Sequence, residues 1–192
     1  MSTILTHPAV PLALGLGLGR RIVSGRLLAA GVLASVLPDI DTIGYRLGVP
    51  YESLFGHRGL THSVLFALLL AIAGALAHRR LNTTALKAFV FLLAAAGSHG
   101  LIDAFTNGGL GVLSFWPFSE KRFFASTRVI EVAPIGVKQL FSARGMVVLM
   151  SEFKWVWQPC FYIMATLVCV AGYFSGPRPD AISEPESPSG KS

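Results

Sequence analysis

Hydrophobic residues along the chain form five runs that are separated by polar stretches. Two runs near the N-terminus, residues 8–19 and 27–38, hold about 12 residues each, whereas a helix needs about 20 residues to cross about 30 Å of hydrocarbon. Three further runs, at residues 60–77, 84–106 and 155–175, are long enough to span a bilayer. The pattern predicts an all-α, polytopic membrane helix bundle with three clear spans and two short N-terminal apolar helices.

The polar segments define the rest of the organisation. Residues 107–154 form the longest polar-containing stretch, and a connection of that length is rarely an idle loop. We expect a partly ordered loop region that folds over one face of the bundle. Residues 176–192 are rich in Pro, Ser and Glu, so we expect a disordered tail. The chain is therefore predicted to hold one integral membrane domain, residues 1–175, followed by that tail.

The composition supports a membrane protein and argues against one class of partner. The hydrophobic fraction is 53% and the charged fraction 14%, against about 25% charged residues in a soluble domain. A net charge of +6 would favour nucleic acid in a soluble protein. Here the basic residues gather in short turns between apolar runs, as topology-setting residues do, so no nucleic acid partner is expected. Two such turns hold Arg20, Arg21, Arg26, Arg79, Arg80 and Lys87.

Histidine and acidic residues within or beside the apolar runs carry the candidate chemistry. Charged side chains at membrane depth are costly and by default mark a functional site. His99 and Asp103 stand four residues apart in a helical run and share one face, a spacing that suits a metal ion. The alternative is a hydrogen-bonded pair in which each group only satisfies the other.

Asp39 and Asp41 follow the second apolar run, which Pro38 helps to end. Two carboxylates that stand two residues apart in a loop can converge on a cation. They can equally belong to a solvated turn at the end of a helix, and the pair taken alone fits both descriptions.

A dense polar block, GHRGLTHS, comes directly before the third run. Histidine is the commonest metal ligand, and Arg58 could bind a phosphate through two hydrogen bonds or stabilise developing negative charge. The alternative is an interfacial helix cap in which Thr61 or Ser63 is the N-cap residue. A cap does not need both His57 and His62.

The expected topology brings these polar groups together. If the two short helices run out and back before the spans, then His7 and the groups around Asp39, His57 and His99 fall at one end of the bundle. The basic turns then fall at the other end. Unrelated structural roles would not predict this convergence, so the sequence predicts a shared metal site. Its candidate ligands are His7, Asp39, Asp41, His57, His62, His99 and Asp103.

At these residues the sequence resembles the YdjM-like family of membrane-bound metal-dependent hydrolases. The resemblance covers about residues 1–175 and rests on the early His7 and on the segments PDID, HRGLTHS, SHGLIDAFTN and WPFS. It implies a hydrolase with a divalent metal in a bacterial inner membrane, as a multi-pass protein.

The sequence is more remotely similar to the zinc-dependent phospholipase C and single-strand nuclease superfamily, which shares the order early His, Asp, His, then His-x-x-x-Asp. On that pattern His7 and Asp103 would help to hold a second metal. The first metal would be held by Asp39 or Asp41, His57 or His62, His99 and Asp103. No histidine follows Asp103, so a full cluster of three metals is not expected.

These observations together predict metal-assisted hydrolysis of an ester, with a phosphoester preferred, at the membrane surface. Zinc is the expected metal because histidine and carboxylate ligands suit it, with iron and manganese as alternatives. Arg58 is expected to hold the anionic group of the substrate, and Asp41 to act as general base if it is not a ligand. A membrane lipid or another small amphiphilic molecule is the expected substrate.

Two other classes of protein remain open at this point. A metal-ion transporter or metal-dependent membrane sensor would use the same residue types, but a transporter should place polar residues through the midplane on several spans. A structural membrane protein with a vestigial site is the third possibility. The basic turns at residues 20–26 and 79–87 are short and dense, which favours a cytoplasmic location for them and a site on the outer face.

Overall fold

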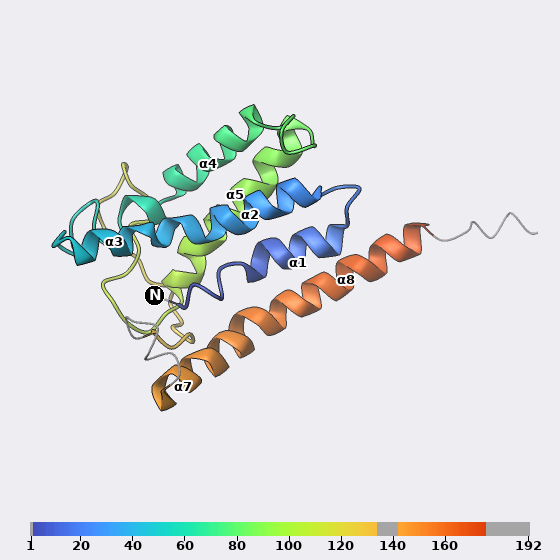
Figure 1. The fold of residues 1–192 in the computed structure, drawn as a ribbon. Coiled ribbons are helices and arrows are strands. Elements are labelled where there is room, and N and C mark those ends of the chain that lie inside the picture. Colours follow the sequence, from blue (N-terminus) through green and yellow to red (C-terminus); the bar gives the residue numbers. More distant parts are fainter. Residues whose placement is uncertain (1, 134–141, 176–192) are drawn as a thin grey trace, which may run out of the picture.

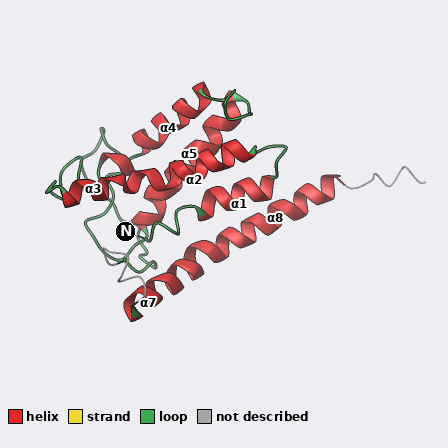
Figure 2. Cartoon of the chain, viewed as in Figure 1, coloured by secondary structure: helices red, strands yellow, loops and turns green. Residues whose placement is uncertain are grey.

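The computed structural model describes residues 2–133 and 142–175, and the predicted tail at 176–192 lies outside them (Figure 1). The described residues form helices and loops without a strand, so the predicted all-α fold is confirmed (Figure 2). The α-helices are α1 (Ala9–Leu18), α2 (Gly25–Val36), α3 (Asp41–Arg46), α4 (Val64–Leu76), α5 (Ala85–Ala104), α7 (Ala143–Glu152) and α8 (Gln158–Ser175). Two 3-10 helices, η1 (Leu37–Ile40) and η2 (Leu60–His62), and a π-helix, η3 (Phe153–Trp157), connect some of them.

Three continuous helical segments in the described part of the chain are long and apolar enough to cross a membrane. They are Gly25–Gly44 and Ala85–Ala104, with 20 residues each, and Ala143–Phe174, with 32. Two shorter apolar helices, Ala9–Leu18 and Val64–Leu76, accompany them. The predicted combination of three spans and two short helices is therefore confirmed. Two individual assignments differ: the run at residues 27–38 belongs to a span, and the run at residues 60–77 forms a short helix.

Each of these two differences from the predicted spans has a local cause in the sequence. The sequence places a helix end at Pro38, but Pro38 lies in the first turn of η1, where its missing N–H costs no hydrogen bond. The helical path therefore continues from α2 through η1 into α3. The run at residues 60–77 instead yields a helix of only 13 residues, because Leu60–His62 turn separately and Ser63 caps α4 by accepting from Phe66 N at 3.1 Å.

The predicted loop region at residues 107–154 is partly confirmed. Its first part covers the end of the bundle at which α5 finishes, where Leu113 N donates to Arg58 O at 3.0 Å and Val64 N donates to Ser114 O at 2.9 Å. Its last part is helical rather than looped, since α7 begins at Ala143 and runs on through η3 into α8. The third span is consequently longer at its N-terminal side than the sequence predicts.

Small residues set the close packing of the helices. An added Cβ at Gly31 of α2 would lie 2.4 Å from Phe91 Cε1 of α5, and one at Gly74 of α4 would lie 1.9 Å from Leu92 Cδ1. At the α1–α8 contact a Cβ on Gly17 would lie 2.9 Å from Leu167 Cβ. Helices in lipid associate through such close backbone approach, because apolar burial alone does not distinguish neighbours from lipid.

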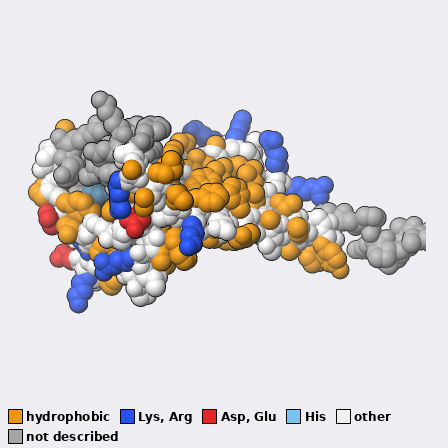
Figure 3. All heavy atoms as spheres, turned by 90° about the horizontal axis from the view of Figure 1, so that it is seen from below, with side chains coloured by type: hydrophobic (Ala, Val, Ile, Leu, Met, Phe, Trp, Pro, Cys, Tyr) orange, Lys and Arg blue, Asp and Glu red, His pale blue; other side chains and the backbone are white. Residues whose placement is uncertain are grey.

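The two ends of the bundle differ in chemistry. At one end the predicted basic turns meet, with Arg26 Nη1 donating to Arg80 O at 3.3 Å and to Asn82 Oδ1 at 3.4 Å. The long loops and α3 gather at the other end (Figure 1). Hydrophobic side chains cover the middle of the face drawn in Figure 3, with Lys and Arg towards its margins. The separation of basic turns from the histidine and aspartate groups is therefore as predicted.

Candidate metal centre

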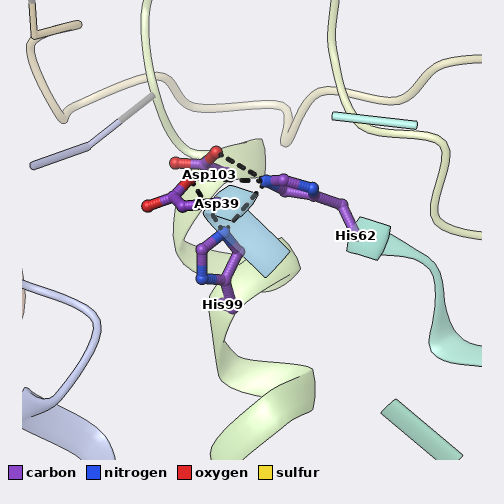
Figure 4. A group of neighbouring side chains, drawn as sticks. All are labelled: Asp39, His62, His99 and Asp103. Carbon is purple, nitrogen blue, oxygen red and sulfur yellow. Dashed lines mark hydrogen bonds and ion pairs between the residues drawn. The ribbon is translucent and has the colours of Figure 1, made fainter. Parts of the chain in front are cut away.

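Four side chains from three segments meet at the loop-bearing end of the bundle (Figure 4). Asp39 comes from η1, His62 from η2, and His99 and Asp103 from the last turns of α5. One ligand atom from each residue lies within 4.8 Å of the others. His99 and Asp103 are fully buried, and His62 and Asp39 are 4% and 5% exposed. We call these four residues the Asp–His cluster.

The distances within the Asp–His cluster fit a tetrahedral ion. Bonds of about 2.0–2.2 Å from zinc to nitrogen and oxygen place the ligand atoms of a tetrahedral site about 3.3–3.6 Å apart. His62 Nε2 lies 3.5 Å from Asp103 Oδ2 and 3.9 Å from Asp39 Oδ1. His99 Nε2 lies 3.5 Å from Asp39 Oδ1 and 2.9 Å from His62 Nε2. Small shifts of the side chains would bring all four atoms to one cation.

The contacts of the Nδ1 atoms of His62 and His99 indicate which nitrogen of each ring carries the proton when the ring is neutral. His99 Nδ1 lies 2.7 Å from Ser35 O, and a carbonyl only accepts, so Nδ1 carries the proton. His62 Nδ1 lies 3.1 Å from Asp41 Oδ2 and donates to that carboxylate in the same way. Without a metal ion, a proton on His62 Nε2 can form the hydrogen bond to His99 Nε2 at 2.9 Å. If a cation displaces that proton, both Nε2 atoms direct lone pairs into the cluster.

The carboxylates of the Asp–His cluster are unequally satisfied. Asp103 Oδ1 accepts from Ser2 N at 2.9 Å and from Ser2 Oγ at 3.1 Å, and its Oδ2 lies 3.1 Å from Arg58 Nε. Within the described residues neither oxygen of Asp39 has a hydrogen-bond partner. A buried carboxylate without donors is costly unless a cation neutralises it. In the described part of the chain Asp39 therefore has both oxygens free to bind an ion, beside the ring nitrogens of His99 at 3.5 Å and His7 at 3.6 Å.

The electrostatics of the site point in the same direction. Burial disfavours charge on His62, but hydrogen bonds to Asp103 and Asp41 outweigh burial and raise its pKa to about 9. The carboxylates thus create a potential that attracts positive charge. With neutral histidines, Arg58 and one divalent cation would balance the three buried carboxylates of Asp39, Asp41 and Asp103.

Asp41 lies beside the Asp–His cluster and collects four donors. Its Oδ1 lies 2.7 Å from His57 Nδ1, and its Oδ2 accepts from Arg58 N at 3.0 Å and from Thr61 Oγ1 at 2.9 Å, with His62 Nδ1 at 3.1 Å. Asp41, His57 and His62 also form a second group whose ligand atoms lie within 4.8 Å. Since Asp41 is fully engaged, its geometry suits a carboxylate that orients His62 and His57.

Arg58 is buried within the protein and faces protein partners. Its Nη1 donates to Gly108 O at 3.0 Å and its Nη2 to Thr106 Oγ1 at 2.7 Å, in addition to the ion pair of Nε with Asp103. Its φ of 61° places a non-glycine residue in the left-handed region, which costs free energy and is found at functional sites. These contacts fix Asp103 and the turn after α5. The expected role in holding a substrate anion stays a prediction.

His7 lies against the Asp–His cluster from the segment before α1. Its ring stacks on His99 with a centroid distance of 3.6 Å, and its Nε2 lies 3.6 Å from Asp39 Oδ2. Burial, reinforced by His99, lowers the pKa of His7 to about 3, so the ring is neutral as a metal ligand must be. The structure thus brings all seven predicted ligand candidates together, with His7 outside both ligand groups.

Three residues in this region escape prediction from the sequence. Ser2 is buried and contacts both Asp103 and His7, with its Oγ 3.1 Å from His7 Nε2. Glu152 of α7 is 1% exposed and accepts from Thr3 N, from Thr3 Oγ1 at 2.6 Å and from Thr6 Oγ1 at 2.8 Å. Arg122 donates to five backbone carbonyls, those of Tyr51, Ser53, His57, Arg58 and Gly111. An acidic residue in a helical apolar region was the available signal for Glu152.

The fold and the Asp–His cluster define a class of protein, a small polytopic membrane protein with a candidate metal centre at one end of its helices. The chain belongs to the YdjM inner membrane protein family, whose profile matches residues 1–176. It is similar to inner membrane protein YbcI of Escherichia coli strain K12, with 42% identity over 168 residues that cover 87% of this chain and 97% of that protein.

These comparisons confirm the resemblance to the YdjM-like family and the location in a bacterial inner membrane. No solved structure matches the chain. The remote similarity to the phospholipase C and nuclease superfamily stays a prediction.

Proposed function

We propose that this protein is a membrane-bound, metal-dependent hydrolase that acts on an ester, preferably a phosphoester, at the membrane surface. The observation that carries the proposal is the approach of His62 Nε2 and His99 Nε2 to 2.9 Å beside the buried Asp39 carboxylate, which has no hydrogen bond within the described residues. Two neutral imidazoles and two carboxylates form a ligand set that suits zinc, with manganese and iron as alternatives.

The proposal gives each residue a defined task. Asp39, His62, His99 and Asp103 hold the cation, which when bound lowers the pKa of water and polarises the ester under attack. Asp41 keeps His62 in the tautomer that presents Nε2, and Arg58 fixes the position of Asp103 through their ion pair. The expectations that Asp41 acts as general base and that Arg58 holds the substrate anion stay predictions.

A transporter is the less favoured function because of what lies beneath the cluster. Outside the cluster, Ser35 and Ser98 are the buried polar residues of α2, α4 and α5, and both lie at the cluster end of their helices. Between them and the basic turns, the buried core of these helices and of the turn before α2 consists of apolar residues. These are Val23, Leu27, Ala34, Ala67, Ala71, Ala88, Phe91, Leu92 and Ala96. A path for an ion across the membrane would need polar side chains or exposed backbone there.

Elemental analysis of the purified protein tests the metal. We expect about one equivalent of zinc or another divalent transition metal in the wild type, and its loss in the double variant His99→Ala/Asp103→Ala. His78→Ala is the matched control, since His78 lies in a basic turn with Nδ1 3.1 Å from Thr83 O. Absence of metal from the wild type after incubation with zinc and with manganese would remove the basis of the proposal.

Hydrolysis is tested separately with chromogenic carboxyl esters, phosphomonoesters and phosphodiesters presented in detergent micelles. We expect turnover of at least one class by the metal-loaded wild type, its loss on chelation, and its recovery when metal is restored. A protein that binds metal stoichiometrically but hydrolyses none of these classes would instead support a sensor or a transporter.

A further inference from the structure

An apolar groove runs along the outside of the bundle and is lined at one end by Asp39 of the Asp–His cluster. It lies between the α2–η1–α3 segment and α4, with a volume of about 690 Å³. That volume falls within the roughly 300–1,000 Å³ typical of ligand pockets. Large apolar side chains in its wall are open to the surroundings, with Leu33 67%, Ile40 54% and Ile43 55% exposed.

The polar groups of the groove are confined to one end. Asp39 and Thr42 are the polar residues among those that line it, and the rest of the wall is apolar. Asp39 is also the cluster residue whose oxygens have no hydrogen bond within the described residues. The Asp39 oxygens are buried behind the wall of the groove, and the other three residues of the Asp–His cluster do not line it. A molecule that fills the groove therefore needs an apolar body, and its polar end would lie beside Asp39, at the wall between the groove and the cluster.

The direction of the groove matches the direction of lipid chains. It follows the span Gly25–Gly44, from Asp39 back to Ala30, a helical rise of about 13 Å. A chain that lies along this helix points from the cluster end of the bundle into the hydrocarbon. Only an extended, flexible apolar group can use such a path.

We propose that the groove binds one alkyl chain of a membrane amphiphile and presents its phosphoester or ester head group to the Asp–His cluster. The proposal rests on the proposed hydrolase function and adds the substrate class, a lipid-like ester that enters laterally from the bilayer. The apolar wall selects for an alkyl chain, and Asp39 links the chain-binding surface to the cation site.

A second groove fits the same role less well. It lies between the N-terminal segment and α7–η3–α8, with a volume of about 830 Å³, and Glu152 is the acidic residue in its wall. The Glu152 carboxylate is already occupied by Thr3 and Thr6. None of the four residues of the Asp–His cluster lines this second groove, so it offers a head group no cation.

Photolabelling of the intact protein in phospholipid nanodiscs tests the proposal without requiring turnover. The probe is a non-hydrolysable alkyl phosphonate with a photoactivatable diazirine at the chain end, and labelled positions are mapped by mass spectrometry. We expect adducts on the wall of the α2–α4 groove. A variant with an enlarged side chain in the wall, Ala73→Trp, should reduce them at least fivefold.

Ala29→Trp is the matched control, since Ala29 is likewise exposed on a helix but lines neither groove. It should leave labelling unchanged, and both variants should retain the metal content of the wild type. An alkyl alcohol of the same length should label the groove several-fold less than the phosphonate, because it lacks the anionic head group.

Adducts spread evenly over the lipid-facing helices, or labelling of the second groove instead, would overturn the proposal. Equal labelling by the alcohol and the phosphonate would overturn the link between groove and cluster. Metal analysis of the wild type stands apart from these readouts, so failure of the hydrolase proposal and failure of the groove proposal are distinguishable.

Discussion

Asp41 illustrates how one side chain organises several others. It accepts from the histidine that faces the cluster, from a second histidine, from a hydroxyl and from a backbone N–H. A carboxylate behind a metal-binding histidine fixes its tautomer and raises its basicity, and its loss typically costs a factor of about 10–100 in metal affinity.

Asp41→Asn should therefore weaken metal binding by about 10- to 100-fold without abolishing it, because the amide keeps the shape but accepts on one atom only. Competition with a fluorescent chelator measures the affinity. Thr61→Val removes a single donor to Asp41 and should have a much smaller effect. Complete loss of metal in Asp41→Asn would mean that Asp41 is itself a ligand.

Replacing Asp39 should change the thermal stability of the metal-free and of the metal-bound protein in opposite directions. Its buried carboxylate lacks hydrogen bonds within the described residues, so its charge is unfavourable until a cation binds. Asp39→Asn should raise the melting temperature of the metal-free protein, corresponding to about 1–3 kcal/mol. The same variant should lose the stabilisation by metal, which is about 2.7 kcal/mol at 100 times the Kd.

Thermal unfolding in detergent, with and without zinc, measures both effects. If the metal-free variant melts below the wild type, the protein itself must compensate the Asp39 charge.

Among the elements, the approach of η2 to α5 decides whether the cluster can form. An added Cβ at Gly100, the residue after His99, would lie 2.6 Å from His62 O, and a backbone atom there cannot rotate away. Gly100 thus allows His62 to reach the same point as His99 and Asp103. The apolar pattern of α5 does not reveal this requirement, because it concerns a contact with a distant segment.

Gly100→Ala should displace His62 and lower metal affinity at least tenfold, as measured by chelator competition. Gly97→Ala is the control on the same helix, since nothing lies within 4 Å of a Cβ at that position. It should keep the affinity and stabilise α5 by about 0.5–1 kcal/mol through reduced chain entropy. Equal metal affinity in the two variants would show that η2 can move without loss of the site.

The sequence predicts the parts of the site that are local and misses those that are not. His99 and Asp103 are recognisable because four residues on one helix place them on one face. The contacts of Ser2 with Asp103 and of Thr3 with Glu152 join residues 101 and 149 positions apart, so no spacing announces them. The sequence marks Arg58 as a candidate functional residue but does not reveal its contacts, which depend on the turn at Thr106 and Gly108. The prediction that the helical segment ends at Pro38 was wrong, because proline is tolerated in the first turn of the 3-10 helix that continues it.

At the scale of the whole molecule, the two turns that carry only basic charge lie at the end opposite the site. The turns at residues 20–26 and 79–87 carry only basic charge, and Arg26 ties them together. At the cluster end, Arg58 is paired with Asp103 and Arg144 with Glu131. Basic residues are retained in the cytoplasm during insertion, but their numbers on the two sides nearly balance. The orientation with a cytoplasmic basic end and a cluster on the outer face therefore rests on the two turns being short and dense in charge.

Labelling of single cysteines in intact cells tests that orientation. In a Cys160→Ala/Cys169→Ala background, Phe118→Cys in the exposed loop should react with a membrane-impermeant maleimide. Arg79→Cys in the basic turn should react only after the cells are lysed. The reverse pattern would place the cluster in the cytoplasm.

The order of the ligands along the chain has a consequence for biogenesis. The last member of the Asp–His cluster is Asp103, at the end of the span Ala85–Ala104, whereas α7 and α8 contribute none of the four. Proteins begin to fold from their N-terminal side during synthesis. The centre can therefore assemble, and be loaded with metal, while the ribosome is still making the C-terminal helices. Glu152 is synthesised later and then accepts hydrogen bonds from Thr3 and Thr6, so the N-terminal segment is held in place only after the four residues of the cluster have been made.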